Sequence, residues 1–190
     1  MKVFDFDNTI YHGESSIDFS IFMIRKNKRI ILYLPTIFIS LVKYKLCLVN
    51  KVKLEKTIND FLKVMIKDKR ETFRMIVEFW AKNEHKLNKR ILGLIKRDDV
   101  IMTASPSFLV HGIQERLNTR NIICTEVDPD KKEMTYFNFG ENKLRRYKKL
   151  YGDRKIDCLF TDSYNDKAIM DISEKVYIVR KGRIRRLKTS

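Results

Sequence analysis

Residues 2–9 of the chain, KVFDFDNT, decide the fold of this 190-residue protein. Residues 2–6 form a short apolar run of the kind that makes a β-strand. Side chains alternate between the two faces of a strand, so Asp5 and Asp7 point to the same side where the strand ends. In a doubly wound α/β sheet this edge is where ligands bind. Two neighbouring carboxylates suit either a metal site or a nucleophile paired with a proton donor.

The chain outside residues 20–97 alternates strand and helix patterns. Short apolar runs predict four further strands, at 100–104, 121–127, 156–161 and 176–180. Helical patterns lie between them, at 105–118, 141–151 and 166–172, and Ser105 and Pro106 suit the N-cap and first position of the first helix. Alternation of this kind is typical of a parallel sheet. We therefore expect a doubly wound, Rossmann-like α/β core.

Residues 20–97 have a different character. They contain 20 Lys and Arg against 6 Asp and Glu, so +14 of the net charge of +16 lies in this block. Only Pro35 and Gly93 interrupt it, and its apolar residues recur at helical spacing. We expect a helical bundle whose core is formed by Ile58, Phe61, Leu62, Met65, Phe73, Ile76, Val77 and Trp80. The change in composition at this block predicts a domain boundary.

The most apolar stretch is 30–49, IILYLPTIFISLVKYKLCLV. Its uncharged part ends at Val42 and is shorter than the roughly 17 to 25 residues that cross a bilayer. Two interpretations stay open: a buried helix of the bundle, or a helix lying on an anionic membrane surface. The second is favoured by the basic residues on both sides, which are Arg25, Lys26, Lys28, Arg29, Lys43 and Lys45.

The basic composition, with an isoelectric point of about 9.8, favours an anionic partner. Nucleic acid, an anionic membrane surface and a phosphorylated small molecule all have that property. The cysteines Cys47, Cys124 and Cys158 have no zinc-ligand spacing, so we expect neither a disulfide scaffold nor a zinc site. Acidic residues near the start leave no room for an apolar signal-peptide core. We therefore expect a cytoplasmic protein, with peripheral membrane contact left open.

Further polar residues follow the later predicted strands. Thr103 lies in the second strand, Lys143 opens the basic helix, and Asp162 and Asp166 follow the fourth strand. Because the carboxyl ends of parallel strands meet at one edge, these side chains should share a crevice with the two carboxylates of the first strand. Alone, Thr103 fits a turn hydroxyl and Lys143 a solvated helix face. The occurrence of all these residues together, in this order along the chain, favours a catalytic site.

These segments resemble the four motifs of the haloacid dehalogenase superfamily, subclass IB, the phosphoserine-phosphatase-like phosphatases. The matching segments are DFDNT at 5–9, VIMTASPS at 100–107, FGENKLRRYKKL at 139–150 and TDSYND at 161–166. The resemblance spans the chain in the right order. It implies a Rossmann-like core, residues 1–12 with 98–190, and a helical cap between the first and second motifs. Residues 13–97 fit that cap in place and size.

The resemblance implies a Mg²⁺-dependent phosphatase that hydrolyses a phosphate monoester. Asp5 would be the nucleophile that forms an aspartyl-phosphate, and Asp7 would be the general acid and base. Mg²⁺ would be bound by Asp5, Asp162 and the backbone carbonyl of Asp7, because this ion prefers oxygen ligands. Asp166 would orient a metal-bound water or the lysine of the third motif.

The same resemblance implies the substrate contacts. Thr103 and Lys143 would hold the phosphoryl oxygens, where positioning and electrostatics supply most of the catalysis. Ala104 and Asn165 are further expected contacts. Glu14 has the spacing from the first motif at which phosphoserine phosphatases carry a glutamate that recognises the substrate's amino group.

Two motifs depart from the phosphoserine phosphatases. Residues 103–106 read TASP where those enzymes have a Ser-Gly-Gly turn, and residues 161–166 read TDSYND rather than GDGAND. The substrate therefore stays open between phosphoserine, a lipid phosphate selected by the basic cap, and other phosphorylated small molecules. Phosphoryl transfer to an acceptor other than water would use the same residues. A nucleic-acid-binding protein with a vestigial site is an alternative of another class, although no known recognition pattern supports it.

Overall fold

The computed structural model describes residues 1–45, 48, 51–66 and 68–187. Its centre is a seven-stranded sheet in the order β4-β3-β2-β1-β5-β6-β7. The strands are β1 (Lys2–Asp5), β2 (Val100–Pro106), β3 (Ile122–Asp128), β4 (Glu133–Tyr136), β5 (Cys158–Thr161), β6 (Val176–Arg180) and β7 (Arg183–Arg186). The central strands β1, β2, β3, β5 and β6 pair in parallel, which confirms the doubly wound α/β core.

Both edge strands are antiparallel to their neighbours and were not predicted from the sequence. β4 pairs with β3, and β7 pairs with β6. The β6–β7 hairpin turns at Lys181 and Gly182, whose φ angles of +49° and +73° suit the twist of a tight hairpin. β7 reads RIRR, with Ile184 as its one apolar residue, so no apolar alternation was present to indicate a strand.

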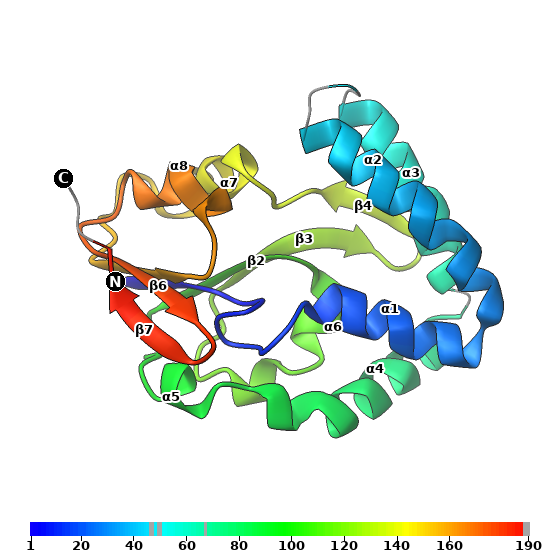
Figure 1. Cartoon of the computed structure of the whole chain (residues 1–190), viewed down its shortest axis with the longest axis horizontal. Helices are drawn as coiled ribbons and strands as arrows, with labels where there is room; N and C mark the ends of the chain where they lie inside the picture. The colour runs from blue at the N-terminus through cyan, green and yellow to red at the C-terminus, as the bar shows by residue number, and fades with distance from the viewer. Residues whose placement is uncertain (46–47, 49–50, 67, 188–190) are drawn as a thin grey trace.

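A run of helices separates β1 from β2 in the chain. They are α1 (Ser15–Lys26), a 3₁₀ helix at Lys28–Tyr33, α2 (Leu34–Lys45), α3 (Lys51–Met65), α4 (Lys69–Asn83), a 3₁₀ turn at Glu84–Lys86 and α5 (Lys89–Leu92). Figure 1 shows α2 and α3 side by side next to β4, with α1 and α4 on the other side of that edge of the sheet. The division into a core and a cap at residues 13–97 stays a prediction.

The helices after β2 differ in part from the expected ones. They are α6 (Ser107–His111), α7 (Glu141–Tyr151) and α8 (Lys167–Met170), with 3₁₀ turns at Gln114–Arg116 and Tyr164–Asp166. Figure 1 shows α7 and α8 above the sheet and α5 and α6 below it, so helices cover both faces. The predicted helix at 105–118 was wrong at its start: β2 continues through Pro106, because a proline holds the preceding Ser105 in extended backbone.

The helices before β2 and the sheet share one hydrophobic core. Trp80 of α4 packs edge-on against Phe6 and Tyr11, and its indole N–H donates to the carbonyl oxygen of Leu109 in α6 at 2.8 Å. The predicted apolar stripe of α4 was wrong at Phe73 and Val77, which are 66% and 51% exposed. α4 buries its Thr72, Ile76, Phe79 and Trp80 face, and Phe73 and Val77 lie beside that face.

Residues 30–45 lie at the surface of the molecule for most of their length. Ile30 is buried, whereas Ile31, Leu32, Ile39 and Val42 are exposed. Residues 46, 47, 49 and 50 of the apolar stretch, Cys47 among them, lie outside the part that the structure describes. Within the described part, no helix is both long and apolar enough to cross a membrane.

Candidate active site

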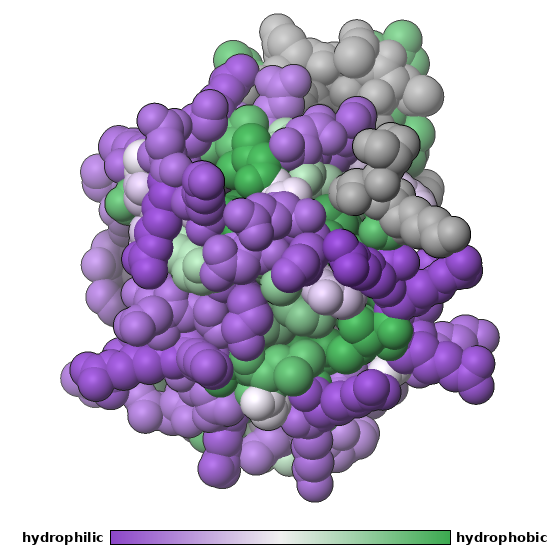
Figure 2. Space-filling view, turned by 90° about the vertical axis from the view of Figure 1, so that its left-hand side faces the viewer, coloured by the Kyte–Doolittle hydropathy of each residue, from purple (hydrophilic) through white to green (hydrophobic). Residues whose placement is uncertain are grey.

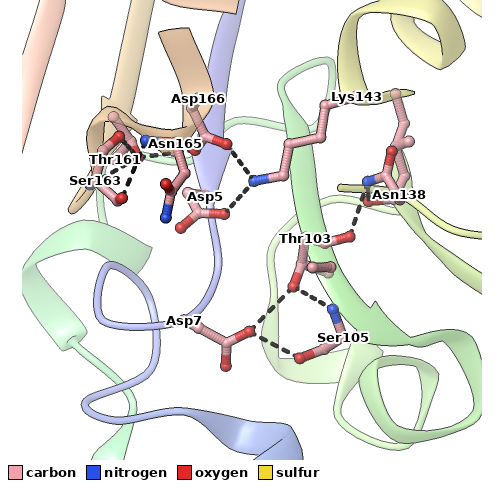
Figure 3. A network of polar contacts seen from close by, with 12 residues as sticks. Asp5, Asp7, Thr103, Ser105, Asn138, Lys143, Thr161, Ser163, Asn165 and Asp166 are labelled. Atoms are coloured by element: carbon pink, nitrogen blue, oxygen red, sulfur yellow. Dashed lines mark hydrogen bonds and ion pairs between the residues drawn. The ribbon is translucent and has the colours of Figure 1, made fainter. Parts of the chain in front are cut away.

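The site lies at the carboxyl ends of β1, β2 and β5. The chain builds the sheet outward from β1 to β4 on one side and then from β5 to β7 on the other. The order of the strands therefore reverses at β1, and ligands of doubly wound sheets bind at such a point. Asp5 ends β1, Thr103 lies in β2, and Asp162 follows β5. The structure brings the predicted motif residues to this one edge (Figure 3).

Lys143 binds two carboxylates at the bottom of the site. It lies in the first turn of α7, and its Nζ is 2.9 Å from Asp5 Oδ1 and 2.7 Å from Asp166 Oδ1. All three side chains are buried. Asp166 is fixed on its other oxygen, Oδ2, which accepts a 2.8 Å hydrogen bond from the hydroxyl of Thr161. Figure 3 shows the ammonium group between the two carboxylates.

Burial and charge act in opposite directions on this cluster. Burial raises the pKa of Asp5 well above its ordinary value, and the positive charge of Lys143 opposes that rise. For Lys143, burial acts to lower the pKa, but the two facing carboxylates outweigh it and raise the pKa above the usual range. Lys143 is therefore a charged residue in a buried position, stabilised by its partners.

Three donors hold the carboxylate of Asp7. Its Oδ1 accepts from the backbone N–H of Ser15, the first residue of α1, at 2.6 Å. Its Oδ2 accepts from the hydroxyls of Ser105 at 2.7 Å and Thr103 at 3.2 Å. Asp7 thus occupies the N-terminal end of α1, where the free N–H groups favour a carboxylate. Its orientation is set by β2 and α1 together.

Ser105 and two neighbouring serines were missed by the sequence analysis, which assigned Ser105 to a helix cap. The Ser105 hydroxyl is 2.9 Å from that of Ser15 and 2.8 Å from that of Ser16, and it is buried. Ser105 follows Thr103 by two positions in β2, so the two side chains share a face. Strand alternation would have placed Ser105 in the site if β2 had been extended by two residues.

Asn138 is a second residue that sequence reasoning missed. It is fully buried, and its side-chain N–H₂ group donates to the backbone carbonyls of Thr103 at 2.8 Å and Ile123 at 3.2 Å. It therefore ties β2 to β3 behind the site. Asn138 lies in a loop, outside the strand and helix patterns, and nothing in its local sequence marks it.

A small cavity of about 130 Å³ opens in front of Asp5. Its walls include almost all of the predicted site residues, namely Asp5, Asp7, Glu14, Ala104, Lys143, Asp162, Asn165 and Asp166, together with Phe139 and Ser163. Thr103 is fully buried with its hydroxyl turned toward Asp7, so it does not line the cavity. Glu14 accepts a 2.7 Å hydrogen bond from the side chain of Asn8 at the rim.

A larger cavity of about 820 Å³ adjoins the small one and shares Asp162 with it. Asn8, His12 and Gly13 line one side, and Arg180, Lys181 and Arg183 of the β6–β7 hairpin line the other. We assign the chemistry to the smaller cavity because it holds the paired carboxylates and the buried lysine. The basic residues that line the larger cavity place positive charge beside the smaller one.

The donor set of the small cavity fits Mg²⁺ in its chemistry. Asp5 and Asp162 line the cavity with their carboxylates, and Mg²⁺ binds through one or two carboxylates while it keeps several waters. Burial also raises the pKa of Asp162, a rise that the side chain of Asn8 partly opposes. Among residues 1–45, 48, 51–66 and 68–187, no three His, Cys, Asp or Glu side chains lie close enough together to form a metal cluster. Lys143 is the cation that faces Asp5 in this structure.

The fold is that of an α/β protein with two neighbouring aspartates, Asp5 and Asp7, at the end of its first strand. The family model of the haloacid dehalogenase-like hydrolases matches residues 3–171, and the chain belongs to that family. The recognised superfamily is thereby confirmed, and with it the expectation of a hydrolase. No curated protein sequence matches the chain.

Several solved structures share the fold. One is a protein of unknown function from Bordetella pertussis Tohama I, with a TM-score of 0.72 at 15% identity, covering 93% of this chain and 87% of that one. A phosphoserine phosphohydrolase-like protein from Francisella tularensis subsp. tularensis SCHU S4 gives 0.58 at 19% identity, over 93% and 86%. Cytosolic 5'-nucleotidase IIIB bound to cytidine gives 0.51 at 13% identity, over 92% and 69%.

Proposed function

We propose that the protein is a Mg²⁺-dependent phosphatase that hydrolyses a phosphate monoester through an aspartyl-phosphate on Asp5. The observation that carries the proposal is the position of Asp5, which faces a small cavity with its Oδ1 2.9 Å from the Lys143 ammonium. Asp7, two residues further on, lines the same cavity. A nucleophile and a proton donor at that separation match the two steps of the reaction.

In the first step, an Asp5 oxygen bonds to phosphorus while the bond from phosphorus to the leaving oxygen breaks. Asp7 gives its proton to that leaving oxygen. In the second step, water attacks the aspartyl-phosphate, Asp7 takes a proton from the water, and Asp5 is released with free phosphate. The three donors on Asp7 keep its carboxylate in place through both transfers.

Lys143 is the proposed contact for the phosphoryl oxygens, because its charge is buried and preorganised. The hydroxyl of Thr103 donates to Asp7, which supports Thr103 as a residue that orients the acid and base. Asp5, Asp162 and the Asp7 backbone carbonyl are the proposed Mg²⁺ ligands, and Asp166 holds Lys143. When bound, Mg²⁺ would neutralise charge on the transferred phosphoryl group.

The direct test is phosphate release from an aryl phosphate in the presence of Mg²⁺. We expect turnover by the wild type, loss of turnover with EDTA, and recovery with excess Mg²⁺. Asp5→Asn should abolish turnover because the amide is a poor nucleophile. Asp153→Asn, at an exposed aspartate outside the site, is the matched control and should keep full activity. Unchanged turnover in Asp5→Asn would refute the mechanism.

We propose a phosphorylated small molecule as the substrate. The basic hairpin residues Arg180, Lys181 and Arg183 beside the site favour substrates that carry negative charge beyond one phosphoryl group. Phosphoserine stays an alternative through Glu14, which lines the cavity. A panel of singly and multiply phosphorylated metabolites would separate these substrate classes.

We place the activity in the cytoplasm, because Cys124 and Cys158 are free thiols.

A further inference from the structure

The surface formed by the 3₁₀ helix at Lys28–Tyr33 and by α2 is apolar along one side. Leu34 at their junction has helical angles, φ −59° and ψ −45°, so the backbone continues from one helix into the other. Leu32, Pro35, Ile39 and Val42 are exposed, at the three- and four-residue spacing that puts them on one helix face. Leu32 is 73% exposed and Ile39 51%. We call this set of four residues the apolar face.

The apolar face lies in a segment without negative charge. Between Phe19 and Leu54 the chain has eight Lys and Arg residues and no Asp or Glu. Arg25, Lys28 and Arg29 are exposed before the apolar face, and Lys43 is exposed after it. These four side chains form no ion pair with any residue that the structure describes. Unpaired positive charge therefore borders exposed apolar side chains at both ends.

The helices of this surface lie beside the edge strand β4. Figure 1 shows α2 and α3 side by side next to that strand. α3 is attached there by Asn59, whose side-chain oxygen accepts a 2.8 Å hydrogen bond from the backbone N–H of Met134 in β4. Figure 2 shows the face that carries the two termini, where hydrophilic side chains surround an apolar area.

We propose that the apolar face and its bordering basic residues dock on the surface of an anionic phospholipid bilayer. The apolar side chains would enter the boundary between headgroups and acyl chains, and the basic ones would contact lipid phosphates. This docking rests on the surface alone and would hold whether or not the proposed phosphatase activity is correct.

Other partners fit this surface less well. A second copy of the chain, joined through the same surface in a twofold dimer, would bring the basic borders of both copies together without acidic residues to balance them. Nucleic acid would use the charges, but it gains nothing from exposed leucine and isoleucine side chains. An anionic bilayer matches both the charge and the apolar area.

The experiment is co-sedimentation of the full chain with vesicles. We expect binding to phosphatidylcholine vesicles that contain phosphatidylglycerol at low salt, weaker binding at high salt, and none to pure phosphatidylcholine. Leu32→Ser with Ile39→Ser should weaken binding by about tenfold or more, because two apolar side chains that would enter the bilayer are lost. The triple variant Arg25→Ser with Lys28→Ser and Arg29→Ser should also weaken binding, and more at low salt than at high salt.

The matched control uses α4, whose Phe73 and Val77 are also exposed but lie among residues of both charges. Phe73→Ser with Val77→Ser should leave vesicle binding unchanged.

The proposal is overturned if anionic vesicles do not bind the wild type, or if the α4 variant loses binding as much as the α2 variant. It is also overturned if light scattering shows a dimer that Leu32→Ser with Ile39→Ser dissociates. Activity on a soluble aryl phosphate should be the same in all of these variants, which separates failure of docking from failure of the phosphatase proposal.

Discussion

Lys143 Nζ lies 2.9 Å from Asp5 Oδ1, although 138 positions separate the two residues in the chain. The contact joins the first turn of α7 to the end of β1 and places a buried positive charge beside the proposed nucleophile. Asp166, on the other side of the ammonium, completes a group of two carboxylates and one lysine. Both the stability and the chemistry of the site should depend on this group.

The first prediction concerns Lys143→Met, which keeps the length of the side chain and removes its charge. Two buried carboxylates would lose their shared partner, so we expect a loss of about 3 kcal/mol in the free energy of unfolding. Phosphate release should fall by about a hundredfold or more, because the phosphoryl oxygens lose their preorganised cation. Thermal unfolding and steady-state kinetics measure the two effects.

Lys148→Met on the same helix is the control for that substitution. Lys148 is exposed and outside the site, so both stability and activity should stay near those of the wild type. Wild-type stability in Lys143→Met would show that the carboxylates do not depend on the ammonium.

The second prediction concerns Ser105→Ala, which removes the shortest hydroxyl contact to Asp7. Asp7 keeps two donors, so we expect the proton transfers to slow rather than stop, with kcat reduced by about tenfold and KM little changed. Steady-state kinetics measure both constants.

Ser173→Ala, which removes a hydroxyl that donates to the Ile169 carbonyl in α8, is the matched control. It should leave kcat and KM unchanged. A Ser105→Ala enzyme whose KM rises while kcat stays constant would argue against a role for Ser105 in positioning Asp7.

The third prediction concerns the thiol of Cys124 in β3. Burial raises its pKa to about 11, so only on the order of one thiol in a thousand is ionised at pH 8. We expect iodoacetamide to modify Cys158, which is partly exposed, well before Cys124 in the folded protein. Peptide mass spectrometry after timed labelling measures both rates. Equal rates without denaturant would mean that β3 opens far more easily than its burial indicates.

The central sheet and most of the site were predictable because their signals are local. An apolar run followed by DFDNT indicates both the first strand and the carboxylates at its end, and the same holds for the strand before Asp162. The edge strands were not predictable, because β7 has one apolar residue among arginines and derives its structure from pairing with β6. Asn138 was missed for a similar reason: its role depends on two carbonyls that only the folded chain brings together.

The inserted helices show where apolar periodicity is ambiguous. The stripe on α4 correctly identified Ile76 and Trp80 as buried, but Phe73 and Val77 fit the same helical spacing and are exposed. Spacing alone does not fix which side of a broad apolar stripe faces the core. That choice is made by Phe6 and Tyr11, which pack against Trp80 and are distant from it in sequence.

The last prediction concerns the contact between α6 and α4 at Gly112. A Cβ atom at Gly112 would overlap Ile76 and lie 3.1 Å from the Trp80 ring, so the end of α6 can approach α4 this closely only without a side chain. Gly112→Ala should therefore lower the free energy of unfolding by about 1–3 kcal/mol, as overpacking does in well-packed cores.

Gly93→Ala is the matched control: the nearest atom to its Cβ would be 3.5 Å away, and its helical φ of −64° accepts alanine. That variant should be as stable as the wild type or slightly more so, because alanine reduces the freedom of the unfolded chain. Denaturant unfolding of both variants measures the difference, and equal stability would mean that α4 and α6 separate at little cost.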